Sequence, residues 1–237
     1  MQRDPMLSRE DARAVAAVAS AVQGATALFL VTFSDFERLG AEARVGVHMA
    51  RAALDAGVRH IALSGGMRTG KVALDAKADL EDAIRALPFA AAHFIHTGFF
   101  YENLVLKGGA PRLACKDGGS GGVALTFYSP FPEDWPVVMH AASDIGRAAV
   151  RRLWQGGEPG QGGQDVVRLA GSKLTGQAYA DAVARLGRRR GWHVMNASYS
   201  TVPAAVLKKA LPGIGKGCGW VGVCVCVWKK NDVCPRS

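Results

Sequence analysis

The chain has 237 residues, of which 49% are hydrophobic and 29 are glycine, and its formal net charge is +9 at pH 7. This length and composition suit one compact α/β domain, alone or with a small second lobe. The basic residues are scattered apart from Arg188–Arg190, and few aromatic residues lie among them. Solvated helix faces and anionic small ligands therefore explain the positive charge best. The scatter of the basic residues argues against direct nucleic-acid binding.

The cysteines and the apolar segments restrict the class further. Cys115 stands alone, and the other four cysteines lie in the last twenty residues without CxxC spacing or a histidine among them, which favours neither a disulfide framework nor a zinc site. The first ten residues are charged and lack the apolar run of a signal peptide, and no stretch reaches the roughly 18 apolar residues that span a bilayer. We therefore expect a cytoplasmic protein with no membrane association.

Hydrophobic periodicity predicts that helices and strands alternate in the first part of the chain. The predicted elements are a helix from Ser8 to Val22, a strand over Ala25–Thr32, a helix over Glu42–Ala56, a strand over His60–Ser64, a helix through Leu74–Leu87 and a strand over Ala90–Ile95. Ser8 is expected to cap the first helix, and Gly57 to follow the second as its C′ residue. This alternation is typical of a parallel sheet.

The remainder of the chain shows shorter and weaker patterns. The predicted elements are strands over Val123–Tyr128 and Val137–Met139, a helix over Ile145–Trp154, a strand over Val166–Leu169, a helix over Thr175–Leu186, a strand over Trp192–Met195 and a helix over Val202–Ala210. The glycine-rich stretch Pro111–Gly122 shows no strong period, and we expect an irregular connection there. Residues 216–237 are expected to form an irregular tail, frayed or paired at a sheet edge.

One loop resembles a phosphate-binding motif. Gly65–Val72, with the sequence GGMRTGKV, satisfies GxxxxGK between a predicted strand and a predicted helix. However, Val72 stands where a P-loop carries the Ser or Thr that holds magnesium, and no predicted strand ends in a metal-binding Asp. The pattern therefore favours a glycine-bearing loop with a solvated Lys71 over a P-loop nucleotide site.

A second set of residues is distributed along the chain. In an open α/β sheet, ligands bind outside the carboxyl ends of the strands. Residues at such positions are Thr32, Phe33 and Ser34 after the first strand, Ser64 at the end of the next, Lys77 on the following helix, and Phe100, Tyr101, Glu102 and Asn103 after the third strand. Singly, Lys77 would be interpreted as a surface lysine and Phe99–Phe100 as core. Their joint position predicts one shared crevice.

Several stretches of the chain resemble a known family. They read ATALFLVT (25–32), EARVGVHMARAALDAGVRHIALSGG (42–66), DAKADLEDAIRA (75–86), TGFFYENL (97–104), ASDIGRAAVRRL (142–153) and VPAAVLKKALPGIG (202–215). These stretches resemble the NmrA-like proteins, which are atypical members of the short-chain dehydrogenase/reductase superfamily. The resemblance implies a Rossmann-like parallel sheet over residues 1–155 with inserted substrate-lobe strands, a C-terminal α+β substrate lobe over 156–215, and a bound NADP or NAD.

The resemblance also implies roles for the residues at the strand ends. Thr32, Phe33 and Ser34 would approach the diphosphate-to-ribose region of the dinucleotide, with Ser64 beside them. Lys77 would hydrogen-bond the nicotinamide ribose, and Phe100 to Asn103 would wall the nicotinamide end. A lysine suits a ribose hydroxyl, and an aromatic wall suits a flat ring.

Three departures from the family pattern bear on function. The glycine-rich βαβ portion with which the family opens does not occur in this sequence, so we expect an N-terminally truncated sheet that lacks about 60 residues. Ala73 stands four residues before Lys77, where a typical short-chain dehydrogenase has its proton-donating tyrosine. His96-Thr97 replaces the Arg-Pro pair that commonly precedes the GxF segment.

Two classes of function remain open, together with a third reading. As an enzyme, the chain would transfer hydride from NADPH to a quinone or another small carbonyl acceptor. As a redox sensor, it would bind the dinucleotide without turnover and signal through a regulatory protein partner. Ala73 favours the sensor. The third reading is a truncated family remnant that binds nothing.

Overall fold

The computed structural model describes residues 8–33, 38, 40–70, 72–104, 112–117, 121–129, 131–155, 163–202 and 224–229. The chain divides into two compact units: the first consists of Met1–Thr97, Ile145–Arg168 and Gly219–Ser237, and the second of Gly98–Asp144 and Leu169–Cys218. The sequence-based boundaries at residues 155 and 215 divide the chain differently, because the polypeptide enters the second unit twice.

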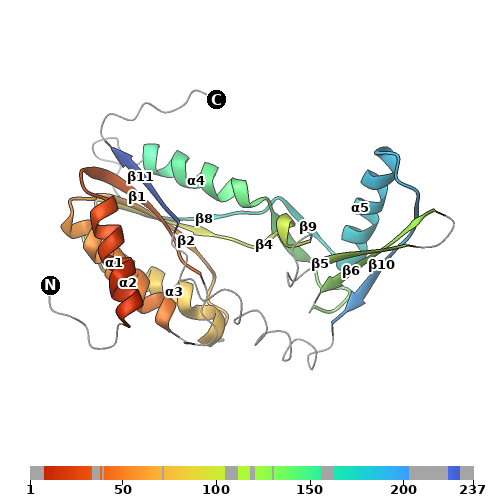
Figure 1. The fold of residues 1–237 in the computed structure, drawn as a ribbon, viewed down its shortest axis with the longest axis horizontal. Coiled ribbons are helices and arrows are strands. Elements are labelled where there is room, and N and C mark those ends of the chain that lie inside the picture. Colours follow the sequence, from red (N-terminus) through yellow and green to blue (C-terminus); the bar gives the residue numbers. More distant parts are fainter. Residues whose placement is uncertain are drawn as a thin grey trace. The chain divides into compact units, whose positions relative to one another are not determined.

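The first unit is built on a five-stranded sheet in the order β11-β1-β2-β3-β8 (Figure 1). Its strands are β1 (Ala25–Val31), β2 (His60–Gly65), β3 (Ala91–His96), β8 (Gln164–Arg168) and β11 (Cys224–Lys229). The strands β1, β2, β3 and β8 run parallel, which confirms the predicted parallel sheet, and β11 pairs antiparallel with β1. Val31 pairs with Ser64, and Gly65 pairs with His96. The carboxyl ends of β1, β2 and β3 therefore lie side by side, and we call this the carboxyl edge of the sheet.

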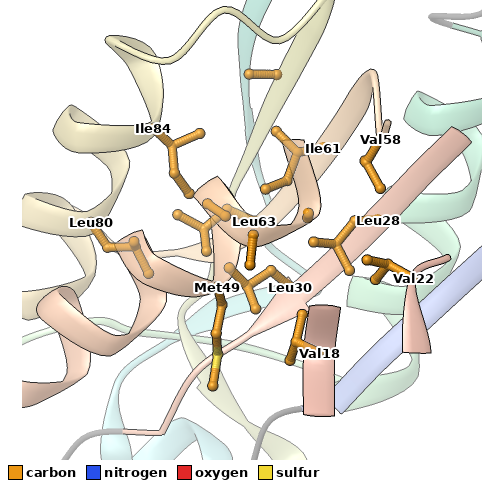
Figure 2. Close-up of a cluster of buried hydrophobic side chains, with 14 of the residues drawn as sticks. Val18, Val22, Leu28, Leu30, Met49, Val58, Ile61, Leu63, Leu80 and Ile84 are labelled. Carbon is orange, nitrogen blue, oxygen red and sulfur yellow. The ribbon is translucent and has the colours of Figure 1, made fainter. Parts of the chain in front are cut away.

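Three helices cover one face of this sheet: α1 (Arg9–Ala21), α2 (Ala41–Asp55) and α3 (Val72–Arg85). Alternate residues of the strands, such as Leu28 and Leu63, are fully buried and pack against Met49 of α2 and Leu80 of α3 (Figure 2). Apolar side chains on one face of each helix therefore form this core with the sheet. Helix α4 (Ala142–Gln155) lies on the opposite side of the sheet (Figure 1).

Local signals in the sequence explain where these helices begin and end. The Ser8 hydroxyl accepts a hydrogen bond from the Asp11 N–H, which confirms Ser8 as the N-cap. The Asp11 carboxylate accepts one from the Ser8 N–H, so the two residues form a capping box. Gly57 follows α2 with a φ of +96°. This left-handed conformation is the one expected of a glycine at C′.

The second unit contains two three-stranded sheets, in the orders β10-β6-β5 and β4-β7-β9. Its elements are β4 (Phe99–Phe100), a 3-10 turn η1 (Tyr101–Leu104), β5 (Arg112–Asp117), β6 (Val123–Ser129), β7 (Val137–His140), β9 (Ser172–Leu174), α5 (Gly176–Arg189) and β10 (Val194–Thr201). Thr175 caps α5 by accepting a hydrogen bond from the Ala178 N–H. The rings of Phe127 and Tyr179 stack with their centroids 5.4 Å apart and form part of the unit's core.

The structure corrects one sequence-based expectation, agrees in part with a second and leaves a third untested. Arg112–Asp117 is a strand, not part of an irregular connection, because it pairs antiparallel with β6. Within the tail, Cys224–Lys229 forms a strand that pairs antiparallel with β1 at the edge of the sheet, so the segment is not irregular, but the expected edge pairing occurs there. Of the predicted helix over Val202–Ala210, only Val202 is among the described residues, so this prediction is not tested. No helix among the described residues is long and apolar enough to span a bilayer.

Candidate functional site

The predicted residues of the first unit lie where β1 and β2 end. Thr32 follows β1 directly and is buried, as is Ser64 near the end of β2. Phe33 comes next in the chain and is 55% exposed, so its ring is accessible at this edge. Ser34 lies outside the described residues. Thr32, Phe33 and Ser64 therefore occupy the sheet edge at which α/β proteins bind ligands.

Lys77 reaches this edge from the second turn of α3. Its Nζ donates to the carbonyl oxygen of Thr32 at 2.5 Å and to Glu42 Oε1 at 2.6 Å, and it lies 3.3 Å from Thr32 Oγ1. The side chain is 23% exposed. Lys77 is therefore held at the carboxyl end of β1 and is not the ordinary surface lysine that the sequence, considered singly, suggested.

Glu42 is a member of this cluster that the sequence did not identify. It lies in the first turn of α2, where a carboxylate interacts favourably with the helix dipole, and its side chain is only 2% exposed. Oε1 accepts hydrogen bonds from Thr32 Oγ1 at 2.7 Å and from Lys77. Oε2 is buried and has no hydrogen-bond partner among the described residues. The sequence showed only an acid near a helix start, because Lys77 is 35 residues away.

A second charged cluster lies one turn further along α3. Glu81 Oε2 is 2.7 Å from His96 Nε2 at the end of β3, and Glu81 Oε1 accepts a hydrogen bond from Arg85 Nη2 at 2.6 Å. The Nδ1 atom of His96 is buried and without a partner among the described residues. A Cβ at Gly65 would lie 3.3 Å from Glu81 Oε2, so a small residue suits the end of β2. His96, at a position where the sequence departs from the family, thus acts within an internal network.

The loop between β2 and α3 is fastened to the helix by Asp75. This carboxylate accepts hydrogen bonds from the N–H of Thr69 at 2.6 Å, the Thr69 hydroxyl at 2.8 Å and the N–H of Gly70 at 2.9 Å. The hydrogen bond from the Thr69 N–H is the largest effect that keeps the pKa of Asp75 below its usual value. Arg68 in the same loop bonds Asp79 and Asp82. A phosphate would have to displace the Asp75 carboxylate from these N–H groups, which argues against a P-loop. Lys71 lies outside the described residues.

The remaining predicted residues belong to the second unit. Phe100 ends β4, and its ring meets that of His140 edge-on with the centroids 5.2 Å apart. In the η1 turn, the Tyr101 hydroxyl is 2.6 Å from Ser172 Oγ, and the Glu102 carboxylate accepts a hydrogen bond from the Ala142 N–H at 3.0 Å. Asn103 is half-buried in the same turn. These four residues form one contiguous segment, and their convergence with Lys77 stays a prediction.

The comparisons with known proteins are consistent with this architecture. The model of the NmrA-like family matches residues 7–218. The chain belongs to the NmrA-like family. None of the curated proteins matches the sequence. Among the residues that the structure describes, no group of three or more His, Cys, Asp or Glu side chains could hold a metal ion.

Several solved structures share the fold. The negative transcriptional regulator NmrA has 21% sequence identity and a TM-score of 0.60, and the match covers 85% of this chain and 63% of that one. The triphenylmethane reductase of Citrobacter sp., solved with NADP(H), has 16% identity and a TM-score of 0.58, with coverage of 85% and 64%. The NADPH-dependent quinone oxidoreductase QOR2 of Escherichia coli, solved with NADPH, has 25% identity and a TM-score of 0.57, with coverage of 85% and 64%. The chain therefore spans less than two thirds of the length of these proteins.

Proposed function

We propose that this NmrA-like protein binds NADP(H) or NAD(H) at the carboxyl edge of the first unit's sheet, with Lys77 contacting the nicotinamide ribose. The observation that carries the proposal is the placement of Lys77: Thr32 and Glu42 hold its ammonium group at the end of β1, yet the side chain keeps partial exposure. Family membership supports it, because structural neighbours were solved with NADP(H) or NADPH.

The residues present fit the ribose end of a dinucleotide better than its pyrophosphate. Lys77 offers a cationic donor, and the exposed ring of Phe33 offers an apolar surface at the same edge. In the described part of the chain, the glycine-bearing loop that comes closest to a phosphate cradle is closed by Asp75. We therefore expect the affinity to depend strongly on contacts at the nicotinamide end.

The chemistry of the site favours a redox sensor over a reductase. A bound NADPH would supply hydride, but Ala73 stands where a short-chain dehydrogenase carries the tyrosine that protonates a carbonyl product. Lys77 would orient the ribose and would not itself donate a proton to the acceptor. Binding with little turnover, reported through a regulatory protein partner, therefore fits these residues best. Slow reduction of a quinone-like acceptor is the second candidate, supported by the likeness to the quinone oxidoreductase.

Calorimetric titration of the folded chain with NADPH, NADH and magnesium-ATP tests the proposal. We expect saturable binding of at least one dinucleotide and none of ATP. Lys77→Ala should weaken dinucleotide binding by about 1–3 kcal/mol, the range for a hydrogen bond to a charged group. Lys71→Ala is the control and should change neither affinity.

The other outcomes separate the alternatives. A folded chain that binds no dinucleotide would identify a family remnant without cofactor. Selective loss of ATP binding in Lys71→Ala would restore the P-loop interpretation. Quinone-dependent oxidation of many NADPH molecules per protein chain would favour the reductase over the sensor.

A further inference from the structure

The Glu42 carboxylate is the most deeply buried charge at the proposed dinucleotide site. Its side chain is 2% exposed, and it contacts both Lys77 and the Thr32 hydroxyl. A buried carboxylate costs several kcal/mol of desolvation, which one ion pair and one hydrogen bond offset only in good geometry. A single-purpose structural contact at this position would be served as well by two apolar side chains. Packing alone therefore does not account for a charge at this position.

The donors of Lys77 indicate what this charge does. A lysine ammonium has three N–H donors. Two of them bond the Thr32 carbonyl oxygen at 2.5 Å and Glu42 Oε1 at 2.6 Å. The remaining contact, with Thr32 Oγ1 at 3.3 Å, is longer than an ordinary hydrogen bond, so a ligand hydroxyl can replace it. Two strong contacts thus fix the direction of the ammonium group and leave one donor for a ligand.

The close packing of α2 against α3 brings the two charged residues together. Gly46 lies one turn after Glu42, and a Cβ there would come within 2.5 Å of Leu80 Cδ2. Leu80 lies one turn after Lys77 and is fully buried (Figure 2). Because Gly46 has no side chain, the two helices approach closely, and this approach brings Glu42 against Lys77.

We propose that Glu42 is a positioning residue for Lys77: with Thr32 it holds the ammonium group at the end of β1, so that one N–H points to a hydroxyl of the bound dinucleotide. This inference rests on the proposed function. Glu42 does not touch the ligand, because both of its carboxylate oxygens are buried. Its effect on binding is therefore transmitted entirely through Lys77.

The test is a double-mutant cycle on NADPH affinity, with circular dichroism to confirm that each variant is folded. Glu42→Gln keeps the shape and the acceptor oxygen but removes the charge. We expect it to weaken NADPH binding about tenfold when Lys77 is present and to have no effect in the Lys77→Ala background. Equal weakening in both backgrounds would mean that Glu42 acts only on the structure, and would overturn the proposal.

Two further variants sharpen this cycle. Glu10→Gln makes the same change in the first turn of α1, where the side chain is exposed, so the affinity should stay within about twofold of the wild type. Gly46→Ala touches neither charged residue but pushes on Leu80. It should weaken binding in the wild type and not in the Lys77→Ala background, as Glu42→Gln does.

A measurement without ligand separates this inference from the proposed function. Trace acetic anhydride acylates uncharged amines, and the yield at Lys77 relative to exposed Lys173 can be measured by peptide mass spectrometry in one sample. We expect Glu42→Gln to raise the Lys77/Lys173 ratio severalfold, because the amine loses the Glu42 contact that holds it at the end of β1. An unchanged ratio would overturn the positioning role. Absence of NADPH binding by the folded wild-type chain would instead overturn the proposed function.

Discussion

Helix α3 carries two sets of ion pairs with similar distances and different surroundings. On its inner side, Lys77 lies 2.6 Å from Glu42, and the two side chains are 23% and 2% exposed. On its outer side, Arg68 lies 2.8 Å from Asp79 and 2.6 Å from Asp82, and all three side chains are at least 50% exposed. Distance alone would rank the two sets as equal. Burial decides which set contributes to stability. Solvent screens the outer pairs, whereas at the buried Glu42 carboxylate no water could take the place of Lys77.

Breaking the inner pair should have the largest effect. Lys77→Met leaves the buried Glu42 carboxylate without its cation, and we expect the free energy of unfolding to fall by about 3 kcal/mol. Urea denaturation followed by circular dichroism measures this loss. The double variant Lys77→Met with Glu42→Leu removes both charges and should recover most of it. A single variant as stable as the wild type would show that the inner pair is no more important than the outer pairs.

The neighbouring Glu81 tests the same contrast one turn along the helix. Its side chain is 9% exposed and joins Arg85 to His96. Glu81→Ala would leave both ring nitrogens of the half-buried His96 without a partner, since Nδ1 already lacks one among the described residues. We expect a loss of about 2 kcal/mol in the same urea measurement. Glu133→Ala, at an exposed position in the second unit, should be neutral and serves as the control.

The sequence predicted α3 but not this division of its charges. Lys77 and Glu81 belong to the same run of charged residues as Asp79 and Asp82, and nothing local separates them. Their burial depends on Glu42 and His96, which are 35 and 15 residues away from their respective partners. Hydrophobic periodicity predicts the helix and its buried side. The order of the strands in the sheet determines which residue lies opposite each charged side chain.

The predictions at the strand ends had a firmer physical basis than the prediction for the tail. Thr32, Ser64 and Lys77 could be placed at one edge because parallel strands share their carboxyl side. Strand β5 escaped prediction because its sequence RLACKD has no clear apolar alternation, although it pairs with the neighbouring β6. The tail could be expected only to fray or to pair at a sheet edge, because β11 pairs with β1, near the other end of the chain. Non-local pairing of this kind leaves little trace in a short window of sequence.

Asp75 should give a smaller effect that depends on pH. The N–H of Thr69 keeps the pKa of this carboxyl below its ordinary value of 3.8, so the folded state binds the proton less readily than the unfolded state. The stabilisation is present above pH 3.8 and is lost as the pH falls through the lower, folded-state pKa. Asp75→Asn should therefore flatten the fall in urea midpoint below pH 3.8 and leave the slope above pH 5 unchanged. An identical acid profile for the two proteins would mean that the loop is held by other contacts.

Removing the outer pairs should change least. Arg68→Ala frees Asp79 and Asp82, but all three groups are already well hydrated, so we expect the melting temperature to change by less than about 2 °C at low salt. Raising the salt to about 0.5 M should abolish even that difference, because the screening length then falls to a few ångströms. The loss caused by Lys77→Met should persist at the same salt concentration, since the Glu42 side chain is out of reach of mobile ions. If Arg68→Ala proved as costly as Lys77→Met, or if salt removed both effects alike, exposure would not be what distinguishes the two sides of α3.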